Sequence, residues 1–190
     1  MVCRKATDRD VWTQLRWRSV HAIKKRKNGL ITAICNSERL LCARFKHSAG
    51  YLSVVVAYAP TEIADIASKD QFYIQLEAAV ADCKKNDLMV ILGDFDAVTG
   101  TNRLQGDTVL GPWGSGFPNE NSDLFLSFCR GQNLSIAGLW FQRKDIRHFS
   151  RSSNDGITWK EIDHMWQGGP SVQSSPQLRH RLFPVLVTLS

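Results

Sequence analysis

LMVILGDFDA, residues 88–97, is an apolar run that stops against two carboxylates, Asp94 and Asp96. A short continuous apolar run bounded by Gly and Asp is typical of a buried β-strand. Gly and Asp also end strands for purely structural reasons, because Gly accepts unusual backbone dihedrals and Asp hydrogen-bonds its own backbone. The alternative is that the strand delivers acidic side chains to a functional loop. The stretch predicts the strand and leaves both interpretations of the acids open.

Segments on either side of this strand predict the rest of the fold. LITAIC (30–35), RLLCARF (39–45) and YLSVVVAY (51–58) are short β-rich runs separated by turn residues, as is typical of antiparallel strands. Apolar residues at helical spacing predict helices over 68–85 and 121–131. Further strand candidates lie at 134–141, 147–150, 157–166 and 182–189. Strands and helices in this order predict an α+β layered sandwich.

The composition is that of an ordinary folded protein, since 43% of the 190 residues are hydrophobic and 22% are charged. No stretch reaches the roughly 18 apolar residues of a membrane-spanning helix, and the charged N-terminus has no apolar signal core. The five cysteines are scattered and odd in number, which is typical of reduced thiols. We therefore expect an intracellular protein, nuclear or cytoplasmic, that is neither secreted nor membrane-bound.

The net charge of +6 is unevenly distributed along the chain. Residues 1–28 contain nine Lys and Arg against two Asp, whereas residues 29–190 contain fifteen basic residues against sixteen acidic ones. The first region includes four consecutive cations, Lys24, Lys25, Arg26 and Lys27. Such a cluster can attract nucleic acid or serve as a nuclear-import patch, and a solvated tail is an equally open interpretation. We interpret 1–28 as a separate basic leader, with disorder as one alternative, and 29–190 as the folded domain.

Polar side chains stand where several predicted strands end. Tyr58 closes the third strand, Asp94 and Asp96 follow the fourth, and Asp163 lies in the late run EIDHMW. Each alone has an ordinary structural explanation, such as a strand-end Tyr with a solvated hydroxyl. Together they fit oxygen ligands around a hard divalent cation such as Mg²⁺. The sequence contains no zinc-protease, nucleophile-elbow, P-loop or dinucleotide-binding motif, so those classes have no support.

Four segments resemble, in order and spacing, the endonuclease/exonuclease/phosphatase superfamily. More specifically, the chain resembles the apurinic-type endonuclease domain of LINE-type non-LTR retrotransposons and its craniofacial development protein 2-like relatives. The segments are VVVAYAPT (54–61), VILGDFDA (90–97), NENSDLFLSFCRGQNLSIAGLWF (119–141) and DGITWKEIDHM (155–165). The resemblance implies a four-layer α/β sandwich that cleaves phosphodiester bonds in DNA with Mg²⁺, or with Mn²⁺.

The resemblance also implies roles for individual residues. Tyr58 would contact the phosphate, and Asp94 would position or deprotonate the attacking water. Asp163 would orient a histidine that stabilises charge on the phosphoryl oxygens, and His180 is the best match to that histidine. These roles agree with the chemistry, because an in-line displacement needs a positioned water, a cation and a donor to the equatorial oxygens.

The sequence departs from the family pattern at four places that bear on activity, and three of them concern the metal and phosphate ligands. Residues 1–28 do not match the opening segment, which brings an Asn and the Glu that is the central metal ligand. We therefore expect an N-terminally truncated, incomplete sandwich with an unsheltered sheet edge and an exposed apolar face. Asp96 replaces an Asn, and we expect it to position phosphate or water or to share a metal ion with Asp94. Arg179 replaces the acid of a terminal Ser-Asp-His, so it could hold a phosphate but not Mg²⁺.

Three functional hypotheses remain open at this point. The first is a Mg²⁺-dependent DNA endonuclease or phosphodiesterase of retrotransposon origin, with weak or lost activity because the main metal ligand is missing. The second is a catalytically inactive module that binds nucleic acid through the basic leader, or that binds another partner. The third is an unstable remnant without a cooperative fold.

Overall fold

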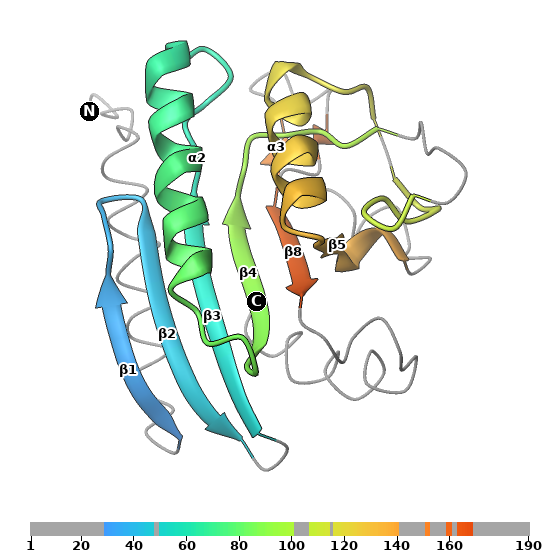
Figure 1. Ribbon diagram of the computed structural model, residues 1–190. Coiled ribbons are helices and arrows are strands. Elements are labelled where there is room, and N and C mark those ends of the chain that lie inside the picture. The colour runs from blue at the N-terminus through green and yellow to red at the C-terminus, as the bar shows by residue number, and fades with distance from the viewer. Residues whose placement is uncertain are drawn as a thin grey trace, which may run out of the picture.

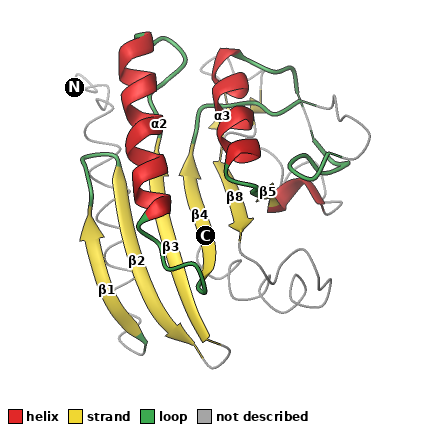
Figure 2. Cartoon of the chain, in the orientation of Figure 1, coloured by secondary structure: helices red, strands yellow, loops and turns green. Residues whose placement is uncertain are grey.

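The computed structural model describes residues 29–47, 50–100, 107–114, 116–140, 151–152, 159–160 and 163–168. These residues form a six-stranded sheet in the order β1-β2-β3-β4-β8-β5, a separate strand pair β6-β7, and two α-helices (Figure 1). Both helices, α2 (Ile66–Ala81) and α3 (Glu120–Gly131), lie on the same face of the large sheet (Figure 2). The expected α+β class is confirmed.

The first three strands form an antiparallel meander. They are β1 (Leu30–Cys35), β2 (Leu40–His47) and β3 (Gly50–Tyr58), and each agrees with its predicted range to within about two residues. Their pairing is antiparallel throughout, because only short turns connect them. The turn between β1 and β2 therefore lies at the same end of the sheet as the last residue of β3.

The run LMVILGD forms β4 (Leu88–Asp94), which lies parallel to β3 because α2 carries the chain back along the sheet. Strand β8 (Asp163–Gly168) pairs antiparallel with the other side of β4, and β5 (Ser135–Ile136) pairs with β8. A strand inside a sheet can be buried on both faces. The side chains of Val90 and Ile91 are both buried, which explains why this run is continuously apolar.

The hydrophobic core lies between the two helices and the sheet. Phe72 and Leu76 of α2, Phe125 of α3 and Ile91 of β4 are all buried there. Phe95, which directly follows β4, lies between the helices, with its ring centre 6.0 Å from that of Phe72 and 5.3 Å from that of Phe125. The aromatic residue between the two acids of the GDFD segment is therefore an anchor that fixes this segment to the core.

The opposite face of the sheet is also buried at its centre. Leu41, Ala43, Val54 and Val90 are buried without belonging to the helix-side cluster, and the two-residue alternation of a strand places them on the second face. At the edge of the sheet, by contrast, residues 31–35 of β1 are exposed. Among the described residues, the exposed run of strand residues thus lies at the β1 edge and not at the centre of the sheet.

Helix α2 begins two residues before its predicted start and ends earlier than predicted. Asp65 is its N-cap, and the Asp65 Oδ1 accepts a hydrogen bond from the Ser68 N–H at 2.8 Å. A carboxylate at this position satisfies one of the amide groups that the first turn of a helix leaves without a partner. Capping by Asp65 therefore sets the true start of the helix at Ile66.

The prediction of a strand over 134–141 is largely wrong. Only the two residues of β5 pair with the sheet, and the chain then forms a short 3₁₀ helix, η1 (Ala137–Trp140). The predicted strand 157–166 is split into β7 (Trp159–Lys160), which pairs with β6 (Arg151–Ser152), and β8. The predicted strands at 147–150 and 182–189 lie outside the described residues.

Candidate functional site

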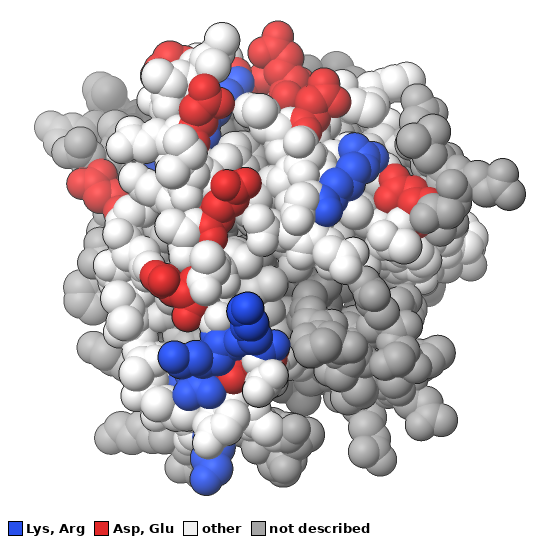
Figure 3. Space-filling model, in the orientation of Figure 1, with Lys and Arg blue, Asp and Glu red and all other residues white. Residues whose placement is uncertain are grey.

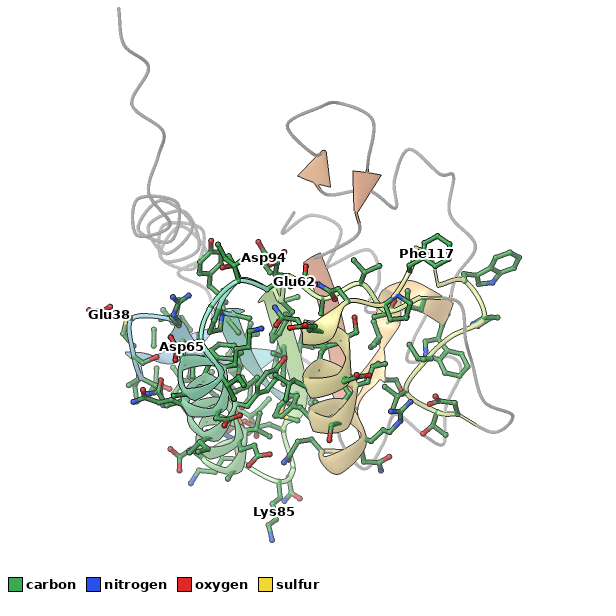
Figure 4. The ribbon with its side chains drawn as sticks, turned by 90° about the horizontal axis from the view of Figure 1, so that it is seen from above. Glu38, Glu62, Asp65, Lys85, Asp94 and Phe117 are labelled. Atoms are coloured by element: carbon green, nitrogen blue, oxygen red, sulfur yellow. The ribbon has the colours of Figure 1, made fainter. Side chains whose placement is uncertain are left out.

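Three of the predicted site residues lie side by side at one end of the sheet. Tyr58, the last residue of β3, is in register with Asp94, the last residue of β4. Asp94 is also in register with Asp163, the first residue of β8. Figure 4 looks down on this end of the sheet and labels Asp94. We call Tyr58, Asp94 and Asp163 the strand-end row, which the topology assembles from three segments that are far apart in the sequence.

Gly93 allows β3 and β4 to approach each other closely beside this row. A Cβ atom at Gly93 would overlap the carbonyl oxygen of Ala57, its register partner on β3. The pairing continues one residue beyond the row, where the Ala59 N–H donates to the Asp94 carbonyl oxygen at 2.9 Å. A glycine inside a strand commonly marks such a close backbone approach. The packing of the sheet therefore requires the Gly of the GDFD segment.

A tight turn after β4 fixes the positions of the two acids. The Asp94 Oδ1 accepts a hydrogen bond from the Asp96 N–H at 2.9 Å, a local bond that Asp commonly makes at turns. Asp96 has a φ of 44°, in the left-handed region that Asp and Asn tolerate better than most residues. The Asp96 Oδ2 accepts a hydrogen bond from the Glu62 N–H at 2.8 Å, which ties the loop after β3 to the loop after β4. An Asn at position 96 could form the same turn and accept the same bond.

The first residues of α3 hold the segment that follows the two acids. The Asn119 Nδ2 donates to the Asp96 carbonyl oxygen at 2.7 Å, and the Asn119 Oδ1 accepts from the Val98 N–H at 3.0 Å. The hydroxyl of the buried Ser122 lies 2.6 Å from the Val98 carbonyl oxygen and donates to it. From the sequence, this region was predicted only as the start of a helix. The structure gives it a second function, which is to position the loop that carries the candidate site.

A cation that the sequence analysis did not single out lies beside the strand-end row. Arg39 is in the turn between β1 and β2, and its Nη1 donates to the carbonyl oxygens of Tyr58 at 3.3 Å and Ala59 at 3.4 Å. The guanidinium carbon lies 5.6 Å from the centre of the Tyr58 ring, within the range of a cation–π interaction. In the sequence, the only signal was an arginine at the first position of a predicted strand, which by itself identifies no ligand.

The surface charge differs between the helix-covered face and the lower end of the sheet. Acidic side chains follow α2 and the start of α3, whereas Lys and Arg gather below, at the end away from the strand-end row (Figure 3). Exposed acids of the two helices include Asp70, Glu77, Glu120 and Asp123. An acidic surface repels a polyanion, so the helix-covered face is a poor approach for nucleic acid.

The donors at this end of the sheet suit a hard cation in kind. Asp94 and Asp96 bring carboxylates, which are ligands that Mg²⁺ prefers. Within the part of the chain that the structure describes, no three His, Cys, Asp or Glu side chains form a group that could hold a metal ion. A complete Mg²⁺ site would therefore need donors in addition to those described side chains.

The structure does not test the other residues predicted for the site. Outside the described residues lie Lys24, Lys25, Arg26, Lys27, Arg179 and His180. Asp163 is placed by its backbone register alone. The roles assigned to all of these residues remain predictions.

Among the described elements, no helix has the length and apolar character needed to cross a membrane.

Comparison with known proteins identifies two sequence relatives, while no family model matches the chain. Craniofacial development protein 2 from Bos taurus is 30% identical over 157 residues, which cover 80% of this chain and 26% of that protein. The protein of the same name from Tragulus javanicus is also 30% identical over 157 residues, covering 80% of this chain and 27% of its own length. The chain thus spans about a quarter of the curated relatives that it matches.

Solved structures with partial similarity include the endonuclease domain of TRAS1, a telomere-specific non-LTR retrotransposon. It is 13% identical, with a TM-score of 0.47, over 68% of this chain and 50% of that chain. An endonuclease/exonuclease/phosphatase from Beutenbergia cavernae is 16% identical, with a TM-score of 0.41, over 70% of this chain and 32% of that chain. The similarity that covers most of this chain is therefore the one to craniofacial development protein 2, and it extends over about a quarter of that protein.

Proposed function

We propose that this chain is an endonuclease-type phosphodiesterase domain of retrotransposon origin that acts on DNA, requires Mg²⁺ or Mn²⁺, and has weak or lost activity. The observation that carries the proposal is the strand-end row, because Tyr58, Asp94 and Asp163 occupy the ends of three adjacent strands. Strands are rigid elements, and polar residues at their ends are well placed to act together on one ligand.

Each member of the row has a role in this proposal. Phosphodiester cleavage needs a water molecule in line with the leaving group and stabilisation of charge on the phosphoryl oxygens. Asp94 would orient or deprotonate that water, Tyr58 would contact the phosphate, and Asp163 would orient His180. A bound Mg²⁺, held by Asp94 and Asp96, would supply Lewis-acid stabilisation of the phosphoryl charge.

One feature supports weak or lost activity. The Asp96 carboxylate already accepts a hydrogen bond from the Glu62 N–H, and unlike the amide of an Asn it offers no donor to a phosphate oxygen. The loss of a donor that stabilises developing charge slows the reaction.

A second candidate function is nucleic-acid binding without catalysis. It is favoured by the structural use of the two acids, which accept backbone hydrogen bonds that hold the loops after β3 and β4. In this case the basic residues 24–27 would supply most of the affinity through contacts to phosphates. Binding would then weaken strongly with salt, would be lost on deletion of residues 1–28, and would be indifferent to Asp94.

The two functions are separated by nicking of supercoiled plasmid with the purified 190-residue chain. Reactions contain Mg²⁺, Mn²⁺ or EDTA, and the Asp94→Ala variant serves as the matched control. For an active enzyme we expect metal-dependent nicking that falls at least a hundredfold in the variant, as for loss of a residue that acts on the attacking water.

Equal nicking by both proteins would indicate a contaminating nuclease and would contradict the assignment of Asp94. No nicking by either protein, together with salt-dependent DNA binding, would support the second candidate. A chain that fails to melt cooperatively would support neither function and would instead favour the unstable remnant.

A further inference from the structure

We propose that Arg39 forms a phosphate-binding position at the strand-end row and contacts a backbone phosphate of nucleic acid. This inference deepens the proposed function and rests on it in one respect, because it assumes that the strand-end row faces a phosphodiester. It adds Arg39, a residue to which the sequence analysis assigned no function.

The guanidinium of Arg39 is fixed in place before any ligand binds. Its Nη1 donates to two successive carbonyl oxygens, those of Tyr58 and Ala59. Its plane is also held near the ring of Tyr58, a residue that is itself buried. The backbone adds a further link, because the Tyr58 N–H donates to the Arg39 carbonyl oxygen at 3.0 Å. A half-buried, anchored side chain loses little conformational entropy when it binds a ligand.

The charge of Arg39 is not neutralised by a carboxylate among the described residues. Two other arginines of the fold differ in this respect. Arg44 pairs with Asp87 at 2.6 Å, and Arg130 pairs with Asp107 at 3.3 Å. Both described hydrogen bonds of the Arg39 guanidinium go to neutral carbonyl groups. A partly buried cation in such a setting attracts an anion more strongly than a fully solvated one, because the local dielectric constant is lower.

Two donor atoms of the guanidinium are available for that anion. Nη1 is occupied by the carbonyl oxygens, whereas Nε and Nη2 have no partner among the described residues. The planar fork of Arg matches two oxygens of one phosphate group, and this geometry makes Arg the preferred residue for bidentate phosphate contacts. Because Arg39 lies over Tyr58, the bound phosphate would lie next to the strand-end row.

The alternative is that Arg39 only stabilises the end of β3. In that role its hydrogen bonds to the Tyr58 and Ala59 carbonyl groups would stabilise the fold, and its removal would not change the dependence of DNA binding on salt. A phosphate contact has a signature of its own, because each phosphate neutralised on duplex DNA adds about 0.9 to the slope of log affinity against log salt.

The test is binding of a fluorescently labelled DNA duplex to the 190-residue chain at several salt concentrations, in EDTA so that no cleavage occurs. The variants are Arg39→Gln, Arg39→Lys and Lys85→Gln. Lys85 is exposed and lies away from the strand-end row, so it matches the charge change without touching the candidate site (Figure 4). Melting temperatures of all four proteins identify any loss that is due to unfolding.

We expect Arg39→Gln to lower affinity roughly tenfold and to reduce the salt slope by about one unit. Arg39→Lys should keep the slope and lose several-fold in affinity, because an ammonium group lacks the planar fork. If Arg39→Gln does not fold, the affinity of Arg39→Lys for DNA, compared with that of the wild type, tests the inference alone. Lys85→Gln should remain within about twofold of the wild type.

The inference is overturned if Arg39→Gln binds like the wild type, if Lys85→Gln loses as much affinity, or if the wild-type chain does not bind DNA. For Arg39→Lys, affinity equal to that of the wild type is the contradicting result. Because binding is measured without metal, a catalytically dead chain can still support the inference. Conversely, metal-dependent nicking that needs Asp94 but not Arg39 would leave the proposed function standing and remove this contact alone.

Discussion

The two ends of the central strands hold their charged groups in opposite ways. At the lower end, Arg44 donates to both oxygens of the Asp87 carboxylate, at 2.6 and 2.9 Å, and the Ser53 hydroxyl donates to it at 2.7 Å. At the strand-end row, the two acids accept hydrogen bonds from backbone amides. Arg39 likewise donates to backbone carbonyl groups there.

The difference separates an ion pair from charged side chains that are held by backbone groups. A buried carboxylate that receives a two-pronged guanidinium and a hydroxyl uses its charge within the protein. Bonds to backbone amides and carbonyl groups fix a charged side chain in position without themselves pairing it with an opposite charge. We therefore expect the lower end to contribute mainly to stability, and the proposed function assigns ligand binding to the strand-end row.

The largest loss of stability is expected from a substitution that pushes apart β3 and β4, two of the strands that carry the strand-end row. Gly93→Ala should cost about 3 kcal/mol of unfolding free energy, because the new Cβ would overlap the Ala57 carbonyl oxygen and the backbone would have to move. Urea denaturation measures this loss. The matched control is Gly131→Ala, where a Cβ meets nothing within 4 Å, and which we expect to be neutral or slightly stabilising. Equal stability of the two variants would contradict the close approach of β3 and β4.

Breaking the ion pair between Arg44 and Asp87 should lower the free energy of unfolding by somewhat less. Asp87→Asn leaves Arg44 without its partner, and we expect a loss of about 2 kcal/mol at pH 7. This is below the usual cost of breaking a fully buried pair, because the Arg44 side chain is 28% exposed. Thermal and urea unfolding measure the loss. A variant as stable as the wild type would indicate that the pair adds nothing to the fold.

The same pair predicts how stability depends on pH. The hydrogen bond from Arg44, with a smaller contribution from Ser53, holds the pKa of Asp87 below its ordinary value against the opposing effect of burial. A lowered pKa in the folded state gives stability that is present above the unfolded pKa of about 4 and is lost as pH falls through the folded value. The difference between wild type and Asp87→Asn should therefore shrink in unfolding experiments below about pH 4.

The smallest effect on stability is expected from replacing Asp96, which lies beside the strand-end row, by Asn. Asp96→Asn should change stability by less than about 0.5 kcal/mol, because Asn tolerates the left-handed backbone and can accept from the Glu62 N–H. Asp96→Ala should lose about 1 to 2 kcal/mol, since Ala provides no acceptor and tolerates the turn poorly. Urea denaturation compares the two variants. An Asn variant as unstable as the Ala variant would mean that the charge itself holds the turn.

Much of the fold was predictable because its elements have strong local patterns. The strands β1 to β4 follow from β-rich runs between turn residues, and the two helices follow from apolar spacing. The end of the strand at 134–141 was not predictable in this way, because Ala137 and Gly138 pack as part of a 3₁₀ helix that the local pattern does not encode. The start of α2 depended on Asp65, a cap outside the apolar spacing.

The sequence by itself determined the buried strand 88–94 and the acids that follow it, because apolar runs and turn residues act locally. Only the tertiary structure decided that Tyr58, Asp94 and Asp163 lie in one row, since the parallel pairing of β3 with β4 and the antiparallel pairing of β4 with β8 join distant segments. It also decided that Phe95 anchors the acids to the core, and that Arg39 reaches the same end of the sheet. Such long-range positions depend on register and packing, which no local pattern specifies.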